Sequence, residues 1–417
     1  MKNPASFEIS QPSYNSDPIA GSYSIGETEL RNIFISKESE LFLQPSAELE
    51  RLKAEYRERF RPKQLRRDAR FAARLSLAGG KYENISAFEF REFGRKGFPR
   101  AKRHLIFAHL LRLSDFEAKY GVEYFGQCLQ TDIPSSIGRV IQVDIPRTLS
   151  FFVSTCGEKT KGILMKMLRD VLWAFAVHKP EIGYCQSMNF IAAYFLSVFG
   201  SAKSSFYALV QLIDSPTNPY VGLHIPGYYA PGMSQLLVDI EVLELFTRSR
   251  VGSREYEVFF ERREISNLSM IVSEWFHTLF VTVFPIRTVD RVFDFMLTGT
   301  SNKSIFRIAC TVLKDLSRRK KELIDLDSVM QGHKRITKLW VDGNQLVVAS
   351  TRGLRMFTGK RLELWRSQVR EVRRNDPQHH SAQPVGNTMM KLEEAIATQN
   401  TLMSVPPTLP EEGAYEP

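Results

Sequence analysis

The sequence predicts an all-α fold, on two observations. Apolar residues recur at helical spacing for more than two hundred residues from about position 88, and the alternating pattern of strands is nearly absent from 88 to 325. Hydrophobic residues make up 43% of the 417 residues, which is enough to bury a sizeable core. No window approaches the roughly 18 uncharged apolar residues that a membrane-spanning helix needs.

Composition divides the chain into successive segments. We expect a disordered N-terminus over 1–36, a basic helical segment and linker over 37–87 that breaks at Pro62, and a helical domain over 88–330. Residues 335–357 alternate in short runs around Asp342-Gly343, which predicts a β-hairpin in a small appendage over 331–373. At its end, residues 359–374 could form a further strand or a helix. The polar, proline-rich residues 374–417 are expected to be a disordered tail.

Within the helical domain, the expected helices carry boundary signals and apolar faces. Residues 161–178 repeat apolar side chains at i, i+4 and i+8, and basic residues followed by Pro180 end the helix. Residues 184–200 are polar at their start, apolar for three turns, and closed by Gly200. Similar patterns predict helices over 99–113, 231–249, 273–285 and 305–324.

Part of the net charge of +10 is concentrated between Arg51 and Arg74. A solvated helix face with i,i+4 ion pairs, such as Glu55 with Arg59, explains this segment at least as well as a patch for anionic lipid or nucleic acid. Aromatic residues are sparse there, so base stacking has little support and no nucleic-acid partner is expected. Weak contact with an anionic membrane stays open as an accessory role.

Several familiar chemistries have no motif in this sequence. The P-loop, HExxH and GxSxG patterns are missing, and the four cysteines form no CxxC pair. The eight histidines are scattered, and no acid–base pair or nucleophile constellation is evident. We therefore expect no metal or cofactor of the chain's own, and any catalytic role would supply polar groups to chemistry housed elsewhere. The start of the chain has no apolar signal region, so a cytoplasmic protein is expected.

Two polar motifs interrupt the apolar helices: IQVDIPRT, at 141–148, and YCQSMN, at 184–189. The helix and turn between them could bring both motifs to one side of the domain. Pro146 fixes its own φ and biases the preceding residue away from helix, which predicts a stiff extended turn presenting Arg147. Arg147 offers a planar fork of donors for phosphate, and Gln186 can orient a water molecule. Together they would suffice to assist GTP hydrolysis in another protein.

Taken alone, each motif also has an ordinary structural explanation. The first would be a loop with an Asp–Arg surface pair, and the second a polar helix N-terminus. Asp144 could also hold Arg103 or brace its own loop. The order, spacing and surroundings of the two motifs favour the functional interpretation.

The chain from about Gly94 to Asp327 resembles the TBC domain, a family of Rab GTPase-activating proteins. GFPRAKRHLIF resembles the opening family motif, with Gly97, Pro99 and Arg103 in place, and IQVDIPRT matches I-x-x-D-x-x-R-T at every fixed position. GYCQSMN is similar to Y-C-Q-G-M-N with one change, and a later stretch from SEWFHTLF to FDFMLTG matches a further conserved segment. The motifs together are highly specific.

The resemblance implies a V-shaped, all-helical domain that binds a GTP-bound Rab and regulates vesicle traffic at endomembranes. By motif position, Arg147 would be the arginine finger and Gln186 the glutamine finger. Supporting roles would fall to Arg103, Asp144, Thr148, Tyr184 and Asn189. GTP and Mg²⁺ would be carried by the partner GTPase.

The sequence departs from the family pattern at three places. Ser187 replaces the usual glycine, Phe107 replaces a tryptophan, and LSFF follows Thr148 where F-P is common. A positive φ at position 187 would strain a serine. These changes motivate an alternative: a catalytically silent TBC scaffold that binds a GTPase or another partner without stimulating hydrolysis.

Overall fold

The computed structural model describes residues 33, 47–153, 157–214, 218, 220–250, 267–319, 326–352 and 358–375. Every regular element within these ranges is a helix, and they contain no β-strand, so the predicted all-α class is confirmed. Almost all of 1–36 and 376–417 lie outside the described residues, and the expectations of disorder there are not tested. Among the described helices, none combines the length and apolar character needed to cross a membrane.

The described helices follow one another in this order along the chain. The first are α2 (Ala47–Leu77), α3 (Ala87–Lys96), α4 (Arg103–Leu110), α5 (Leu113–Tyr120) and α6 (Tyr124–Gln130). The next four are α7 (Ser135–Phe152), α8 (Glu158–His178), α9 (Met188–Phe199) and α10 (Ala202–Asp214). The last are α11 (Ser234–Arg250), α13 (Asn267–His277), α14 (Ile286–Leu297), α15 (Lys303–Arg318), α16 (Leu326–Lys338), α17 (Gly343–Arg352) and α18 (Gly359–Asn375).

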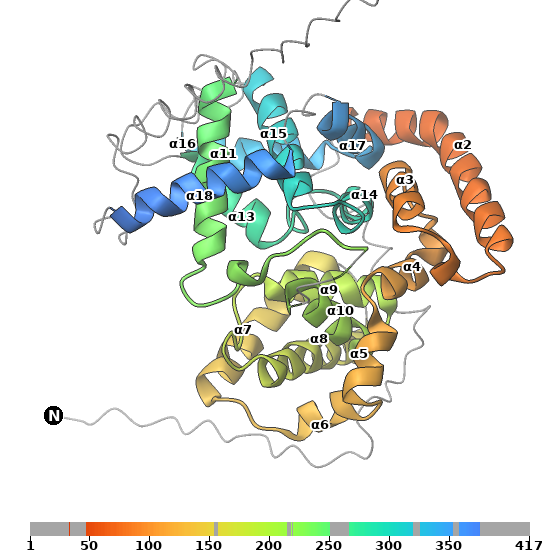
Figure 1. Ribbon diagram of the computed structural model, residues 1–417, viewed down its shortest axis with the longest axis vertical. Coiled ribbons are helices and arrows are strands. Elements are labelled where there is room, and N and C mark those ends of the chain that lie inside the picture. Colours follow the sequence, from red (N-terminus) through yellow and green to blue (C-terminus); the bar gives the residue numbers. More distant parts are fainter. Residues whose placement is uncertain are drawn as a thin grey trace, which may run out of the picture.

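Figure 1 shows two groups of helices, with α5 to α10 in one and α11, α13 and α15 to α18 in the other. In the first group, α9 packs against α7, α8 and α10. Residues 191–196 of α9 are fully or almost fully buried, because apolar side chains occupy every side of this helix. The helix ends at Gly200, whose φ of 67° suits a glycine cap, as the sequence predicts.

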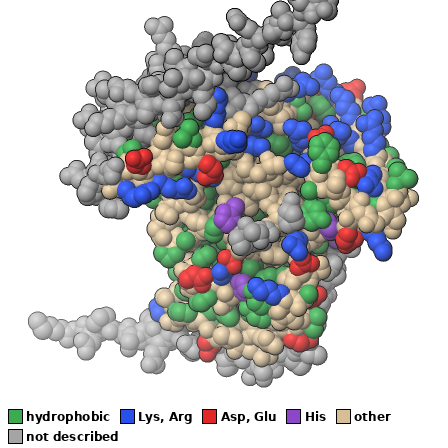
Figure 2. All heavy atoms as spheres, viewed as in Figure 1, with side chains coloured by type: hydrophobic (Ala, Val, Ile, Leu, Met, Phe, Trp, Pro, Cys, Tyr) green, Lys and Arg blue, Asp and Glu red, His purple; other side chains and the backbone are tan. Residues whose placement is uncertain are grey.

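The N-terminal basic segment forms one helix rather than two. Pro62 lies inside α2, so the predicted break is wrong, and Figure 1 shows the helix bending along its length instead. Phe71 of α2 is buried in the same core as the central helices. Figure 2 shows Lys and Arg side chains gathered over α2 and along α18.

The predicted β-hairpin near Asp342 is wrong, because this part of the chain is helical. The Asp342 carboxylate accepts a hydrogen bond from the backbone N–H of Asn344 at 2.9 Å and caps the start of α17. Leu346 and Val347 then bury against α14 and α15. An aspartate followed by glycine serves as a helix start here, and the helical unit extends through α18.

The opening motif locks α3 and α4 onto α14. Arg103 is buried and donates to Asp294 Oδ1 at 3.0 Å and to Asp290 Oδ2 at 3.0 Å. Gly97 has a φ of 102°, and a Cβ there would lie 2.8 Å from the Arg291 guanidinium. Glycine is therefore required at this close approach.

Candidate functional site

The first polar motif lies inside a helix, not in an extended turn. α7 continues through Pro146, so the predicted stiff turn around Arg147 is wrong. The apolar residues Ile141, Ile145 and Leu149 are buried at helical spacing, and their packing outweighs the local bias against helix before proline. Pro146 has no N–H, so the carbonyl of Gln142, four residues earlier, loses its helical hydrogen bond. Gln142 and Pro146 are both exposed, so water can bond to that carbonyl instead.

Arg147 is held by the helix that carries it. Its Nη2 lies 2.5 Å from Asp144 Oδ1, three residues earlier on α7. The Arg147 side chain is 47% exposed, whereas that of Asp144 is 3% exposed. The pairing of Asp144 with Arg103 is wrong, since Arg103 bonds to α14. A guanidinium has five N–H donors, so Arg147 keeps donors directed at solvent while one edge is anchored.

Asp144 also joins the first motif to the second. The Tyr184 hydroxyl donates a hydrogen bond to Asp144 Oδ2 at 2.5 Å. Burial, together with this bond, raises the pKa of Tyr184, so its hydroxyl stays protonated and remains a donor. One buried carboxylate therefore fixes both Arg147 and the segment that precedes α9.

A second contact between the motifs lies deeper in the domain. Asn189 is buried and donates through Nδ2 to Thr148 Oγ1 at 2.6 Å. The Thr148 hydroxyl in turn donates to the Asp144 carbonyl at 2.6 Å. Asn189 Oδ1 accepts from the backbone N–H of Ser187 at 2.9 Å, which ties the turn to the start of α9. The expected convergence of the two motifs is thus present in the structure.

The turn between Tyr184 and α9 places Gln186 at the surface. Gln186 is exposed, and its side chain makes no hydrogen bond with another described residue. Ser187 has a φ of 90° and a ψ of −25°, so the position where the family motif has glycine does adopt a positive φ. Glycine would take this conformation without steric cost, whereas serine is strained.

The structure also reveals a neighbour of this turn that the sequence did not indicate. Cys185 Sγ lies 3.4 Å from His277 Nε2, which is 92 residues away in the sequence. Burial raises the pKa of Cys185 and lowers the pKa of His277 to about 4. Both groups are therefore neutral near pH 7, and the pair braces the turn rather than forming a thiolate nucleophile.

The predicted site residues fall into two places. Asp144, Arg147, Thr148, Tyr184 and Asn189 form one connected network, with Gln186 on the turn beside it. Arg103 belongs to a separate buried cluster with Asp290 and Asp294, so its support is structural. Within the described ranges, no three His, Cys, Asp or Glu side chains come together as a metal site.

Comparison with known proteins places this arrangement in a family. The model of the Rab-GTPase-TBC domain matches residues 89–324, more than half of the chain. Human growth hormone-regulated TBC protein 1 is 31% identical over 248 residues, which cover 60% of this chain and 70% of that protein. The mouse protein of the same name is 28% identical over 293 residues, covering 66% and 76%.

Two solved structures share the fold. The Ypt/Rab-GAP domain of Gyp1p superposes with a TM-score of 0.54 at 17% identity, covering 70% of this chain and 99% of that domain. The Chlamydomonas flagellar RabGAP TBC domain gives a TM-score of 0.51 at 19% identity, covering 63% and 84%. The match over residues 89–324 establishes that this chain belongs to the Rab-GTPase-TBC domain family.

Proposed function

We propose that this protein accelerates GTP hydrolysis by a Rab-family GTPase, with Arg147 as arginine finger and Gln186 as glutamine finger. Family membership implies a Rab GTPase as partner. The observation that carries the proposal is the network that joins the two motifs. The two segments that carry the exposed side chains of Arg147 and Gln186 are joined by hydrogen bonds of the buried residues Asp144 and Asn189.

Arg147 would neutralise charge that develops on the phosphates. Its anchored edge on Asp144 limits the orientations of the guanidinium, and its remaining donors can reach an anion without breaking that pair. Such pre-organisation lowers the cost of placing a cation in the transition state. Arginine fingers in GTPase systems contribute about 10³–10⁵ in rate.

Gln186 would position the attacking water. Its amide can donate to one group and accept from another, which is what orienting a water requires. The adjacent backbone is fixed by the Ser187 N–H bond to Asn189 and by the contact of Cys185 with His277. GTP and Mg²⁺ are carried by the Rab, so the chain needs no hydrolase site of its own.

Single-turnover GTP hydrolysis by a panel of GTP-loaded Rabs tests this function. We expect the wild-type protein to accelerate at least one Rab, and Arg147→Ala and Gln186→Ala to return the rate towards the intrinsic value. Arg139→Ala is the matched control, because Arg139 is also an exposed arginine of α7. If no Rab is accelerated, or if the Arg147→Ala variant is as active as wild type, the proposal fails.

A catalytically silent scaffold is the second candidate function. The strained Ser187 beside Gln186 is the observation that favours it, because a turn that relaxed from this positive φ would move the glutamine. Stable binding of a GTP-bound Rab without any change in its hydrolysis rate would support this alternative over the first.

The cellular setting follows from the same proposal. A Rab partner implies a cytoplasmic protein that works at the surface of endomembranes and regulates vesicle traffic. The exposed basic residues of α2, among them Arg57, Arg66 and Arg70, would add a weak contact with anionic lipid. Other charges on α2 are paired, as in Arg51 with Glu55. Sedimentation with anionic liposomes at low and moderate salt tests this accessory role, and no retention at low salt would remove it.

A further inference from the structure

One histidine from the second group of helices reaches the turn that carries Gln186. His277 is the last residue of α13, and its Nε2 lies 3.4 Å from Cys185 Sγ. Cys185 directly precedes Gln186 in the sequence. Figure 1 shows α13 in one group of helices and α9 in the other. The contact therefore joins the glutamine turn, at the start of α9, to a part of the domain that contains neither polar motif.

The His277 side chain is held in place by a tyrosine. The Tyr229 ring stacks on the imidazole, with ring centroids 5.3 Å apart and an angle of 24° between the ring planes. The Tyr229 hydroxyl also donates to the His277 carbonyl at 2.9 Å. Tyr229 is buried, and burial raises its pKa well above the ordinary value, so the hydroxyl stays a donor. Tyr229 thus restrains both the ring and the backbone of His277.

The backbone that follows His277 forms a tight, strained turn. Leu279 and Phe280 have φ values of 50° and 65° and are fully buried. Side chains with a Cβ rarely adopt this left-handed region, so the surrounding contacts must hold the turn in place. The Phe280 N–H donates to the Trp275 carbonyl at 2.8 Å and closes the end of α13. Such strain persists where the position of a neighbouring residue is fixed by the fold.

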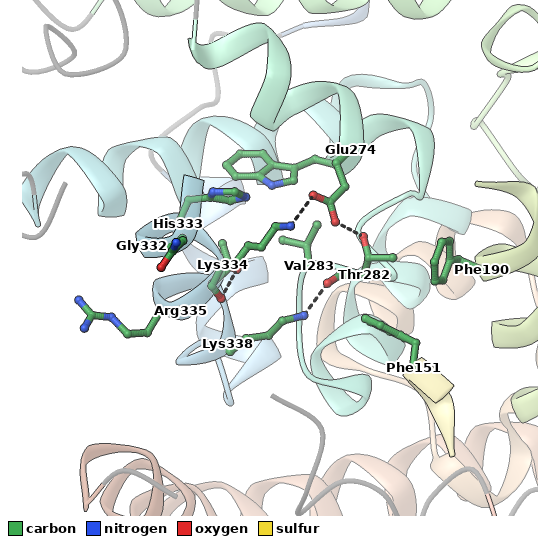
Figure 3. Close-up of a pocket in the computed structure, with 13 residues that line it drawn as sticks. Phe151, Phe190, Glu274, Thr282, Val283, Gly332, His333, Lys334, Arg335 and Lys338 are labelled. Atoms are coloured by element: carbon green, nitrogen blue, oxygen red, sulfur yellow. Dashed lines mark hydrogen bonds and ion pairs between the residues drawn. The ribbon is translucent and has the colours of Figure 1, made fainter. Parts of the chain in front are cut away.

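Polar side chains lock the same turn. The Thr278 hydroxyl donates to the Glu274 carbonyl at 2.8 Å. Figure 3 shows the Glu274 carboxylate directed at the Thr282 hydroxyl, which donates to its Oε1 at 2.9 Å. Lys338 of α16 is 5% exposed, and its Nζ donates to the Thr282 carbonyl at 2.5 Å. The end of α13 is therefore tied to its own helix and to α16, which restricts the position of His277.

The glutamine turn is held less firmly by its own contacts. The φ of 90° at Ser187 is unfavourable for a serine. After Gln186, the Ser187 N–H donates to Asn189 Oδ1 at 2.9 Å. Before Gln186, the Cys185 N–H donates to the sulfur of Met188 at 3.4 Å, and a thioether is a weak acceptor. The contact of Cys185 with α13 reinforces the side of the turn that has the weaker bond.

We propose that His277 is a positioning residue for Gln186. Through Cys185, it keeps the turn in the conformation that presents the glutamine to the attacking water, and this inference rests on the proposed function. Without the contact, the turn can relax from the positive φ of Ser187 and move the amide. A displacement of about 1 Å in a catalytic group lowers a rate by about 10²-fold. The position of the glutamine finger thus depends on the second group of helices.

Single-turnover GTP hydrolysis at saturating protein tests this role, with the Rab that wild type accelerates most. His277→Leu keeps an apolar side chain but removes the ring nitrogens, and it is expected to lower the rate about 10- to 100-fold. Its dissociation constant for that Rab, loaded with a non-hydrolysable GTP analogue, should stay within about threefold of wild type, because the contact acts on the transition state. His277→Gln should recover part of the rate, since its amide can still reach the thiol.

A double-mutant comparison distinguishes positioning from a general effect on the fold. If His277 acts through Gln186, His277→Leu should cost less than about twofold in rate when Gln186→Ala is already present. Cys185→Ala removes the other partner of the contact and should show the same loss with the same dependence on Gln186. Urea denaturation shows whether His277→Leu folds, and Cys185→Ala carries the test if it does not.

His109→Leu is the matched control. His109 is also a partly buried histidine packed against aromatic rings, those of Phe90 and Tyr220, and it lies outside both motifs. Its substitution should leave the hydrolysis rate at saturating protein unchanged.

The outcomes separate this inference from the proposed function. Equal losses from His277→Leu with and without Gln186 overturn the inference, because they reveal a general effect on the fold. Wild-type rates in both His277→Leu and Cys185→Ala, together with a slow Gln186→Ala, overturn it alone and leave both fingers intact. If Gln186→Ala is as active as wild type, or if no Rab is accelerated, the glutamine role fails and this inference falls with it.

Discussion

Replacing Ser187 by glycine is expected to stabilise the folded domain, because this residue has a backbone conformation that suits glycine. Its φ of 90° lies in the left-handed region. The serine hydroxyl makes no hydrogen bond with another described residue, and the bond from the Ser187 backbone N–H to Asn189 survives the change. The substitution therefore removes strain without removing a contact.

The magnitude follows from two opposing terms. An L-residue in the left-handed region costs roughly 1–2 kcal/mol. Glycine lowers the free energy of unfolding by about 0.5–1 kcal/mol, because it makes the unfolded chain more flexible. The free energy of unfolding of Ser187→Gly should thus rise by about 0.5–1 kcal/mol.

Equilibrium urea denaturation measures this change as a higher midpoint at an unaltered slope. Ser187→Ala is the control, because alanine keeps the Cβ atom that makes a positive φ unfavourable, and it should give no gain. A gain in the alanine variant equal to that in the glycine variant would refute the reasoning, as would a lower midpoint for Ser187→Gly.

Three further predictions concern buried polar groups. Tyr184→Phe should lower the free energy of unfolding by about 1.5–3 kcal/mol, because Asp144 loses a hydrogen bond; an unchanged urea midpoint would contradict it. Arg103→Met should cost about 3–5 kcal/mol, since Asp290 and Asp294 lose the buried arginine that pairs with both, and only Asp294 keeps an ion pair with Arg291; a loss below about 1 kcal/mol would argue against the cluster. The stability of Lys338→Met relative to wild type should fall as the pH rises from about 7 to about 10. Burial lowers the folded pKa of Lys338 well below 10.5, so the unfolded wild-type chain binds the extra proton in this window, and wild-type stability rises with pH. Urea midpoints at several pH values check this, and a constant difference would contradict it.

The sequence predicted the helical class and the convergence of the two motifs, because both depend on strong local signals. The helix over 161–178 has a clear apolar face and a clear end, and the observed α8 ends at His178. The length of that helix then determines that the segments before and after it meet. The contacts of Tyr184 with Asp144 and of Asn189 with Thr148 confirm that convergence.

Other features depended on tertiary contacts that local patterns do not contain. The bias of Pro146 against helix is overridden by the burial of Ile141 and Leu149 on the same face of α7. The turn signal at Asp342 fits a hairpin and a helix cap equally well, and packing against α14 selects the cap.

The partners of Arg103 could not be predicted at all from local sequence. Asp290 and Asp294 lie 187 and 191 residues further along the chain. The positive φ of Ser187 could be predicted in part from the sequence. The family motif indicated that glycine is usual there, and only the structure shows that the serine adopts the conformation that glycine favours.

The most direct test of the central claim is single-turnover GTP hydrolysis by the Rab that wild-type protein accelerates most, with Arg147→Ala and Arg147→Lys compared at saturating protein. Arg147→Ala should lose about 10³–10⁵ in rate while its affinity for the Rab stays within about threefold of wild type. Arg147→Lys should restore only part of that loss, because lysine lacks the planar fork of donors. Hydrolysis at the wild-type rate in the Arg147→Ala variant would contradict the account.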